Sequence, residues 1–267
     1  MNGRAVLVLG LLGAVGLAVA AGSGPVEARP AGGREPLRPG WKRRVILRVA
    51  RNEGDFDSIN LHDGGGISFG ILQWNQRTGD LGDLLAAMQQ ASPAEFARVF
   101  GSSSRELLAV VRGSTVDDRL QPVAGEHLNS GPWPERFRAA GRLQVFQDVQ
   151  LLVAETGPHF RAALDVADML RARWEKAIAL FFDTAVQQGA GAARTVGRAV
   201  ANRGLAEEEL LGAFAQVSAD RARRTARPSG SSGRGLAWRE VDGEWHLHAG
   251  ATDLYLLILR RRLELLS

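Results

Sequence analysis

The sequence has no cysteine among its 267 residues, and it has only one tyrosine and three methionines. The absence of cysteine excludes disulfide bonds, thiolate zinc sites, iron–sulfur clusters and a cysteine nucleophile. The net charge is also small, because 33 Lys+Arg against 29 Asp+Glu leave +4. This excess is too little to indicate a nucleic-acid partner. With 45% hydrophobic residues, the chain can nevertheless bury a core as one large or two small domains.

Long apolar runs are scarce too, and the one present is residues 5–21, which follows Arg4 and precedes small residues as far as Ala28. This order is typical of a secretory signal. At about 17 residues the run is at the lower limit for crossing a bilayer, so an uncleaved anchor is the alternative. We predict a signal peptide over residues 1–28, a linker over 29–40 and one domain over 41–267. We expect a secreted, periplasmic or cell-envelope protein, without stable membrane insertion once the signal is removed.

Most of the domain has helical periodicity. Apolar residues from Trp41 to Ala50 recur at the spacing of one helix face, and Gly54 ends this helix. Ser92 and Ser103 each stand three residues before a glutamate, which predicts capped helix starts. Further helices are predicted over 134–140, 142–155, 159–186 with a break near Arg171, 191–202, 206–224 and 254–266.

Residues 67–74, Ile-Ser-Phe-Gly-Ile-Leu-Gln-Trp, give the best β signal in the chain. The fold class predicted is therefore mainly α, a helical bundle of two lobes with one small β-hairpin at the active-site cleft. A second small hairpin is expected around Trp245. His246 and His248 alternate there, with Glu244 as a third candidate ligand, but no fourth ligand is evident, so we predict no metal site.

Two carboxylates flank the segment between the first helix and the hairpin. Glu53 lies at the last turn of the helix, where the negative end of the helix dipole tends to raise a carboxyl pKa. Asp63 precedes three glycines, which leave it open to water. One protonated and one ionised carboxyl group are what glycoside hydrolysis requires, and Ser68 could hold the attacking water. The alternative is that both are solvated groups beside a turn.

Two separated passages resemble known enzymes. Residues 63–74, the Thr-Gly-Asp-Leu of 78–81 and the two leucines of 84–85 resemble the hairpin and following helix of chitosanases in glycoside hydrolase family 46. That family belongs to the lysozyme-like superfamily. Far downstream, residues 181–189, Phe-Phe-Asp-Thr-Ala-Val-Gln-Gln-Gly, resemble the family's aromatic-aromatic-Asp helix, which ends at a glycine. The resemblance implies an α+β lysozyme-like fold and hydrolysis of β-1,4-linked amino-sugar polymers, without a cofactor.

The resemblance also implies roles for single residues. Glu53 would be the general acid and Asp63 the general base, and Ser68 would replace a threonine that positions the water. Asp80 would bind an amino sugar. Asp183 would belong to a buried charge network, for which Arg221 is the expected partner because it lies in a downstream helix. Beyond the resemblance, we also expect substrate contacts at Asp57, Gln73 and Trp74, the last because it follows the hairpin.

Two departures leave the substrate open. The stretch from Glu53 to Asp63 is shorter than the corresponding chitosanase loop, and Gly65 stands where a basic residue is expected. Residues 53–83 hold six carboxylates against one arginine, a local charge of −5 that would attract the polyammonium chain of chitosan. The net charge of +4 instead suits approach to an anionic cell wall. Chitosan is therefore the leading substrate and peptidoglycan the alternative, for a monomeric protein. A non-catalytic wall-binding protein of the same fold is the third possibility.

Overall fold

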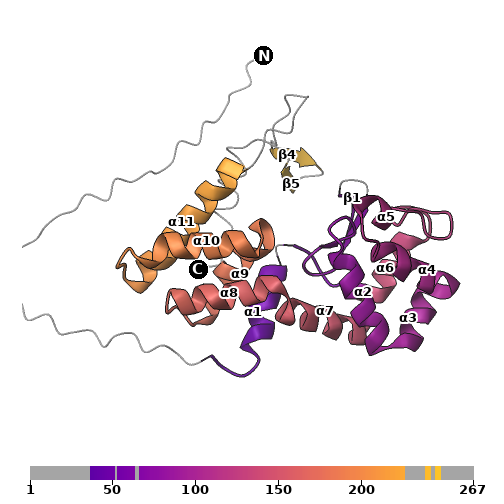
Figure 1. The fold of residues 1–267 in the computed structure, drawn as a ribbon, viewed down its shortest axis with the longest axis horizontal. Coiled ribbons are helices and arrows are strands. Elements are labelled where there is room, and N and C mark those ends of the chain that lie inside the picture. Colours follow the sequence, from indigo (N-terminus) through magenta and orange to yellow (C-terminus); the bar gives the residue numbers. More distant parts are fainter. Residues whose placement is uncertain (1–36, 52, 64–65, 226–237, 242–243, 248–267) are drawn as a thin grey trace, which may run out of the picture. The chain divides into compact units, whose positions relative to one another are not determined.

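The computed structural model describes residues 37–51, 53–63, 66–225, 238–241 and 244–247 (Figure 1). The predicted signal peptide, residues 29–36 of the linker and the predicted helix over 254–266 lie outside these residues. Within the described part of the chain, no helix is both long enough and apolar enough to cross a membrane.

The described elements are mostly helices, with short strands after the first helix and near the end. Their bounds are α1 Trp41–Ala50, β1 Ile59–Asp63, β2 Gly66–Phe69, β3 Trp74–Asn75, α2 Asp80–Ala91, α3 Pro93–Phe100, η1 Gly101–Ser103, α4 Ser104–Val111, α5 Val116–Arg119, α6 Trp133–Gly141, α7 Gln144–Thr156, α8 Pro158–Met169, α9 Glu175–Gln188, α10 Ala190–Ala201, α11 Glu207–Thr225, β4 Trp238–Val241 and β5 Glu244–Leu247.

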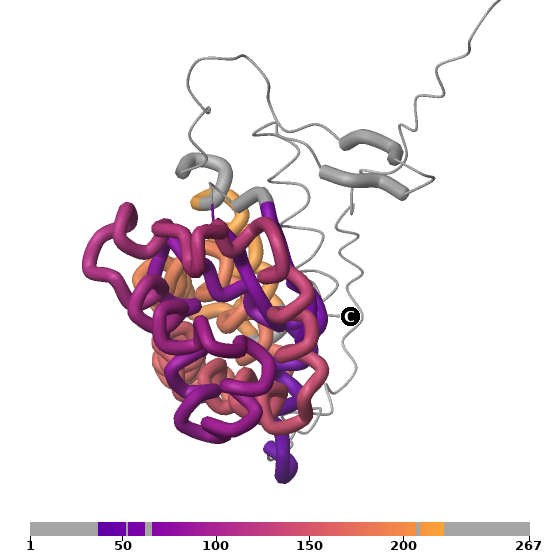
Figure 2. The backbone as a smooth tube through the Cα atoms, turned by 90° about the vertical axis from the view of Figure 1, so that its right-hand side faces the viewer, coloured from indigo at the N-terminus to yellow at the C-terminus, as the bar shows by residue number. Residues whose placement is uncertain are grey.

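The helices pack in two groups joined by α7 (Figure 1). The first, here called the sheet-side group, consists of α2 to α6 with the sheet β1–β3, and its connection over residues 120–132 runs as a loop (magenta in Figure 2). The second, the C-terminal group, consists of α8 to α11 and also contains α1, which packs against α9 although it comes first in the chain. Because α7 contacts α2 and α6 as well as α1 and α8, it belongs to both groups.

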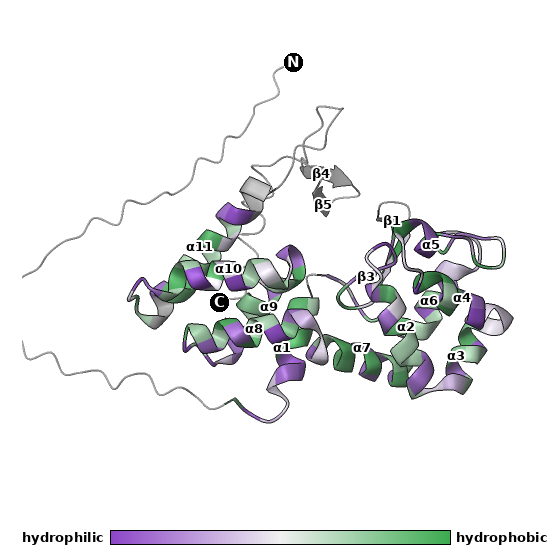
Figure 3. Ribbon diagram, viewed as in Figure 1, coloured by the Kyte–Doolittle hydropathy of each residue, from purple (hydrophilic) through white to green (hydrophobic). Residues whose placement is uncertain are grey.

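Each group has its own cluster of aromatic rings. In the sheet-side group, Phe137 lies 5.3 Å from Phe69 and 5.5 Å from Phe100, measured between ring centroids. In the C-terminal group, Phe160 and Phe182 lie 5.1 Å apart. All five rings are buried. Figure 3 shows hydrophobic residues gathered on the helix faces that meet other helices, as the periodicity predicts.

The sheet is larger than the predicted hairpin. It has three antiparallel strands in the order β1-β2-β3, because the chain turns after Phe69 and pairs again through Trp74 and Asn75. Ile59 pairs with Phe69, but the register between β1 and β2 shifts before Asp63 pairs with Gly66. Such irregularities bend a strand and redirect its side chains. The strand that carries Asp63 therefore has a bulge beside that residue.

The helix breaks follow the sequence. α8 ends at Met169 and α9 begins at Glu175, with Arg171 at a φ of 52° between them, so the predicted break is confirmed. Gly189, at a φ of 88°, turns the chain from α9 into α10. The β4–β5 hairpin is also confirmed by its backbone pairing, whereas the side chains of β5 lie outside the described set.

The predicted capping is wrong in one respect. Ser92 and Ser103 do stand immediately before α3 and α4, but neither side chain accepts a capping hydrogen bond. The backbone at Ser92 has a ψ of 86°, and the helix after it begins with Pro93, which has no N–H to contribute. The capping box that does form is at α5, between Thr115 and Asp118.

Candidate active site

Glu53 lies in the turn that ends α1, as predicted. Its backbone N–H donates to the carbonyl of Ala50 at 2.8 Å, and the N–H of Gly54 donates to the same oxygen at 2.9 Å. Gly54 has a φ of +154°, and a Cβ there would come within 2.7 Å of the Ser58 Cβ. Only glycine fits this turn without strain. The half-buried Glu53 is therefore held at the exit of a rigid helix.

The loop after Glu53 is attached to α7 by one buried glutamine. Gln150 donates from Nε2 to the carbonyl of Phe56 at 2.8 Å, and its Oε1 accepts from the N–H of Ile71 at 3.0 Å. Gly141 at the end of α6 lies against the same loop, because a Cβ there would be 2.3 Å from the Phe56 carbonyl oxygen. These contacts hold the loop between Glu53 and the sheet against α6 and α7.

Sequence reasoning did not identify Gln150 or Gly141. A signal for Gln150 was present, because it stands four residues after Phe146 and four before Ala154, on the apolar face of α7. A polar residue in that position must find buried partners. The partners themselves, Phe56 and Ile71, are distant in sequence and could not be inferred.

Asp63 and Ser68 lie on adjacent strands. The backbone of Asp63 ends β1, and its side chain lies outside what the structure describes. Ser68 on β2 pairs with Asn60 on β1. Its side chain is fully buried, and its Oγ accepts a hydrogen bond from Asn75 Nδ2 at 3.0 Å. Ser68 is thus linked to β3, and its predicted contact with a catalytic water stays a prediction.

Three of the predicted substrate contacts line one pocket. This pocket, here called the Asp80 pocket, has a volume of about 210 Å³, and its wall includes Gln73, Trp74 and Asp80. The other side comes from the end of α7 and the start of α8, so the pocket lies where the two helix groups meet. Its remaining lining residues are Leu72, Asn75, Thr78, Asp83, Val153, Ala154, Gly157, Pro158, His159 and Val186.

Asp80 is the first residue of α2 and is exposed to solvent. Thr78 Oγ1 donates to its Oδ2 at 3.0 Å, which orients the carboxylate. Gln73 has a positive φ of 52°, and its Nε2 donates to the carbonyl of Gly70 at 2.9 Å. Trp74 is 9% exposed, so it contributes only a small surface to the pocket. The pocket therefore combines carboxylates with a small aromatic surface.

His159 is a pocket residue that the sequence did not reveal. It is half-buried at the start of α8, opposite Asp80. Burial lowers the pKa of His159 below its usual value of 6.5, while the negative charge of Asp80 opposes that change. The imidazole is therefore mainly neutral at neutral pH. No feature of the sequence around His159 connects it with Asp80.

Asp57 does not line the Asp80 pocket. Its Oδ2 accepts from Arg142 Nε at 2.9 Å, an ion pair between the loop after α1 and the residue that follows α6. Asp183 is fully buried in α9, and its Oδ1 accepts from Gln187 Nε2 at 3.3 Å. Arg221 lies on α11, which packs against α9. The roles predicted for these residues stay predictions.

In the part of the chain that the structure describes, no three His, Asp or Glu side chains are grouped so that they could hold a metal ion. The polar side chains that line the Asp80 pocket are two carboxylates, two amides, one hydroxyl and one imidazole. Acid–base chemistry on a bound polar substrate is the reaction type that such groups support.

This chain is mainly helical, with a small antiparallel sheet after its first helix. Its fold is similar to that of the chitosanases of glycoside hydrolase family 46. A chitosanase of that family from Gynuella sunshinyii, solved with chitotetraose, matches 86% of this chain over 88% of its own, with a TM-score of 0.57 and 17% identity. The native chitosanase of Bacillus subtilis matches 71% of this chain over 80% of its own, with a TM-score of 0.52 and 16% identity. A mutant of the Bacillus subtilis enzyme, solved with 6 GlcN, is 18% identical with the same TM-score and coverage. No protein-family model matches the sequence, and no curated protein matches it.

Proposed function

We propose that this protein is an exported glycoside hydrolase that cleaves chitosan with inversion at the anomeric carbon. The observation that carries the proposal is the Asp80 pocket, in which Asp80, Gln73 and Trp74 converge within a chitosanase-like fold. The ligands in the similar structures are chitotetraose and 6 GlcN, both amino-sugar oligomers.

In the proposed reaction, Glu53 gives its proton to the glycosidic oxygen as the bond from that oxygen to C1 breaks. Asp63 takes a proton from a water molecule, whose oxygen forms the new bond to C1 from the opposite face. Glu53 ends ionised and Asp63 protonated, and exchange with solvent restores both groups. The turn at Gly54 and the contacts of Gln150 support this assignment, because they hold the Glu53 loop in one position.

The Asp80 pocket supports a cationic substrate. Asp80 and Asp83 both line it, and both are exposed, so they are accessible to a glucosamine ammonium group. The local charge of −5 over residues 53–83 acts in the same direction. We therefore infer that Asp80 accepts hydrogen bonds from the amino group of one glucosamine unit.

The test is to incubate the purified protein separately with chitosan, chitin and peptidoglycan, to weigh the products by mass spectrometry and to follow their anomers by NMR. We expect glucosamine oligomers released from chitosan with the α-anomer formed first. Release of muropeptides alone would replace the proposal with a muramidase. An absence of products from all three polymers would favour a wall-binding protein.

Replacing Asp80 by Asn should lower kcat/KM for chitosan about 10- to 100-fold, because a hydrogen bond to a charged group contributes roughly 1.5–3 kcal/mol. The loss should appear mainly in KM if Asp80 only binds the amino group. A matched control is Asp117→Asn, which removes the same charge from an exposed site on α5. Equal losses in the two variants would show a general charge effect instead.

His159 should make substrate binding depend on pH. Because its folded pKa lies below 6.5, His159 takes up a proton as the pH falls below that value, and the new cation competes with the substrate ammonium for Asp80. We expect the ratio of KM in wild type to KM in His159→Gln to increase as the pH is lowered from 7.5 to 5. Protonation of chitosan itself cancels in this ratio. A ratio that is independent of pH would contradict the effect.

The free energy of unfolding should also depend on pH through His159. The unfolded state binds a proton at His159 more readily than the folded state, so this group destabilises the fold as the pH falls below 6.5 and has no effect above it. Urea unfolding of wild type and His159→Gln at pH 5 and pH 7.5 measures the difference.

Export is the remaining part of the proposal. A basic residue, an apolar run and small residues precede the domain, as a cleaved signal requires. The mass of the protein recovered outside the cytoplasm should be lower by residues 1–28. Recovery of the full-length mass from the membrane fraction would show a retained anchor.

A further inference from the structure

The hairpin of β1 and β2, which carries Asp63, has few side chains of its own to hold it in place. Three glycines follow Asp63 in the sequence, and the register of β1 against β2 shifts before Asp63 pairs with Gly66. Glycine has no side chain to pack and allows the backbone many conformations. A general base must nevertheless stay within hydrogen-bonding reach of its water. The position of Asp63 must therefore depend on contacts from other segments.

Gln76 makes the first of these contacts. It directly follows β3 and is 2% exposed. Its backbone N–H donates to the Ile67 carbonyl at 2.9 Å, and its Oε1 accepts from the Ile67 N–H at 3.2 Å. The side-chain oxygen of Gln76 thus takes the place of a backbone carbonyl, and it extends the pairing of β2 with β3 by one residue.

The same glutamine lies against the residue opposite Asp63. A Cβ on Gly66 would be 3.0 Å from Gln76 Oε1 and 3.0 Å from Leu120 Cδ2, so both side chains pack closely on the Gly66 backbone. Gly66 is the backbone partner of Asp63. A displacement of the Gln76 side chain would therefore move Gly66, and with it the strand that ends at Asp63.

Gln76 is itself attached to α5. Its Nε2 donates to the carbonyl of Arg119, the last residue of that helix. The Arg119 side chain returns to the residue after Gln76, because its Nε and Nη2 donate to the carbonyl of Arg77 at 2.9 and 2.7 Å. Its Nη1 donates to the carbonyl of Gly113 before the helix, at 2.9 Å. These bonds, with the capping box of α5, make the helix end a firm attachment for Gln76.

The other strand of the hairpin is attached to the same part of the chain. Asn129, in the loop between α5 and α6, donates from Nδ2 to the carbonyl of Leu61 on β1 at 3.3 Å. Leu61 lies two residues before Asp63. The segment from α5 to α6 therefore holds both strands, β2 through Gln76 and β1 through Asn129.

We propose that Gln76 is a positioning residue for the general base, and that it holds the hairpin where Asp63 can take a proton from the attacking water. This inference rests on the catalytic role proposed for Asp63. Gln76 is not a lining residue of the Asp80 pocket. Its loss should therefore slow the chemical step and leave the binding of glucosamine oligomers unchanged.

The first experiment is Gln76→Met, which keeps an unbranched side chain of similar length but removes both side-chain hydrogen bonds. We expect kcat for glucosamine oligomers to fall about 10- to 100-fold, because a misplacement of about 1 Å can cost as much as 10²-fold. KM should stay within about twofold of the wild-type value. A rise in KM with unchanged kcat would assign Gln76 to the Asp80 pocket instead. Wild-type values of both constants would also overturn the proposal.

A double-mutant cycle with Asp63→Asn tests whether Gln76 acts through Asp63. Gln76→Met should lower kcat in the wild-type background and have no further effect once Asp63 is replaced. Equal fold losses in the two backgrounds would contradict positioning. Full activity of Asp63→Asn alone would instead contradict the general base, so failure of the two proposals can be distinguished.

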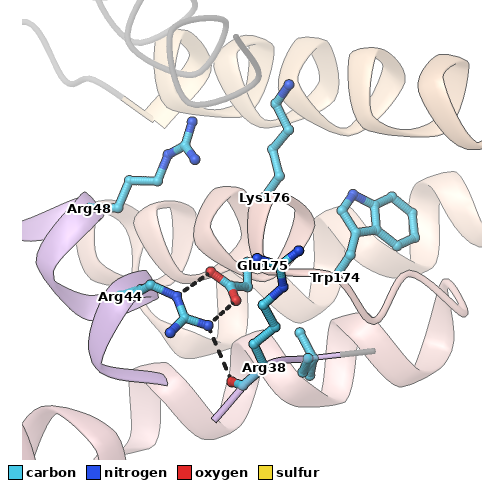
Figure 4. A pocket seen from close by; sticks show the side chains of 7 residues that line it. Arg38, Arg44, Arg48, Trp174, Glu175 and Lys176 are labelled. Carbon is cyan, nitrogen blue, oxygen red and sulfur yellow. Dashed lines mark hydrogen bonds and ion pairs between the residues drawn. The ribbon is translucent and has the colours of Figure 1, made fainter. Parts of the chain in front are cut away.

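Two controls separate positioning from stability, with a melting curve recorded for every variant. Gln121→Met makes the same exchange at an exposed residue, whose Nε2 donates to the carbonyl of Asp117. Arg44→Gln removes hydrogen bonds in the C-terminal group, where Arg44 binds Glu175 and the carbonyl of Arg38 (Figure 4). We expect wild-type kcat from both controls, even if Arg44→Gln melts earlier. A matching fall of kcat in Arg44→Gln would reduce the effect of Gln76 to one of stability.

Asn129→Ala keeps the inference testable if Gln76→Met does not fold. Asn129 is only half-buried, so the Leu61 carbonyl can exchange its lost partner for water. We expect kcat to fall about 2- to 10-fold, the worth of one neutral hydrogen bond, with KM unchanged. The fall should disappear in the Asp63→Asn background. A folded Asn129→Ala protein with wild-type kcat, beside a Gln76→Met protein that does not fold, would overturn the proposal.

Discussion

Replacing Glu53 by Gln should reduce chitosan cleavage about 10²–10⁴-fold while leaving the thermal unfolding of the protein unchanged. General acid catalysis is worth roughly that factor, and glutamine has no proton to give to the leaving oxygen. The substitution keeps the size of the side chain, and the turn around it depends on the backbone of Glu53 and Gly54. The loss should therefore appear in kcat, with little change in the affinity for glucosamine oligomers.

Turnover of soluble chitosan and a melting curve, measured on the same samples, test this expectation. Glu135→Gln is a suitable control, since this glutamate is 73% exposed on α6 and forms an ion pair with Arg138 on the same helix. A Glu53→Gln enzyme that retains more than about a tenth of wild-type turnover would remove Glu53 from the role of general acid. A large fall in melting temperature would instead give Glu53 a structural role.

Replacing Gln150 by Leu should lower the free energy of unfolding by about 2–4 kcal/mol. The substitution leaves the Phe56 carbonyl and the Ile71 N–H without their side-chain partner, and each such buried group costs roughly 1–3 kcal/mol. Activity should also fall in the protein that remains folded, because the loop after Glu53 loses its attachment to α7. This second effect distinguishes a positioning residue from one that only stabilises the core.

Urea unfolding followed by tryptophan fluorescence measures the stability, and kcat measured well below the unfolding transition gives the second effect. Gln144→Leu is the control on the same helix, because Gln144 is exposed and its side chain donates a hydrogen bond to the exposed Asp148. We expect that change to stay within about 0.5 kcal/mol. A Gln150→Leu protein with wild-type kcat would limit Gln150 to stability.

The sequence was sufficient to predict most of the helices, because their apolar residues recur strictly and the breaks are marked by particular residues. Arg171 and Gly189 both adopt positive φ between helices that were expected to end there. The third strand was missed because the β signal over residues 67–74 indicates one continuous run, whereas residues 70–73 form a turn and Trp74 begins a separate strand. Its pairing with β2 depends on the turn after Phe69, which local propensity does not specify.

Some residues of the candidate site could likewise be predicted from the sequence, and others could not. Asp80 was predicted as a substrate contact from the resemblance to chitosanases and Trp74 because it follows the hairpin, and the structure brings both to one pocket together with Gln73. His159 and Gln150 lie about 80 residues further along the chain than their partners in the site. Only the packing of α7 and α8 brings His159 to the pocket and Gln150 to Ile71. Contacts between segments so distant cannot be derived from one sequence without knowing the fold.

The position of α7 has a consequence for how the protein comes apart. The aromatic clusters around Phe137 and Phe160 belong to one continuous apolar core. Helix α7 lies against elements of both groups, and its residue Phe146 is buried close to Phe96 on the sheet side. If α7 melted, water would reach both clusters at once. We therefore expect the two helix groups to unfold in a single cooperative transition, in a chain that has no disulfide.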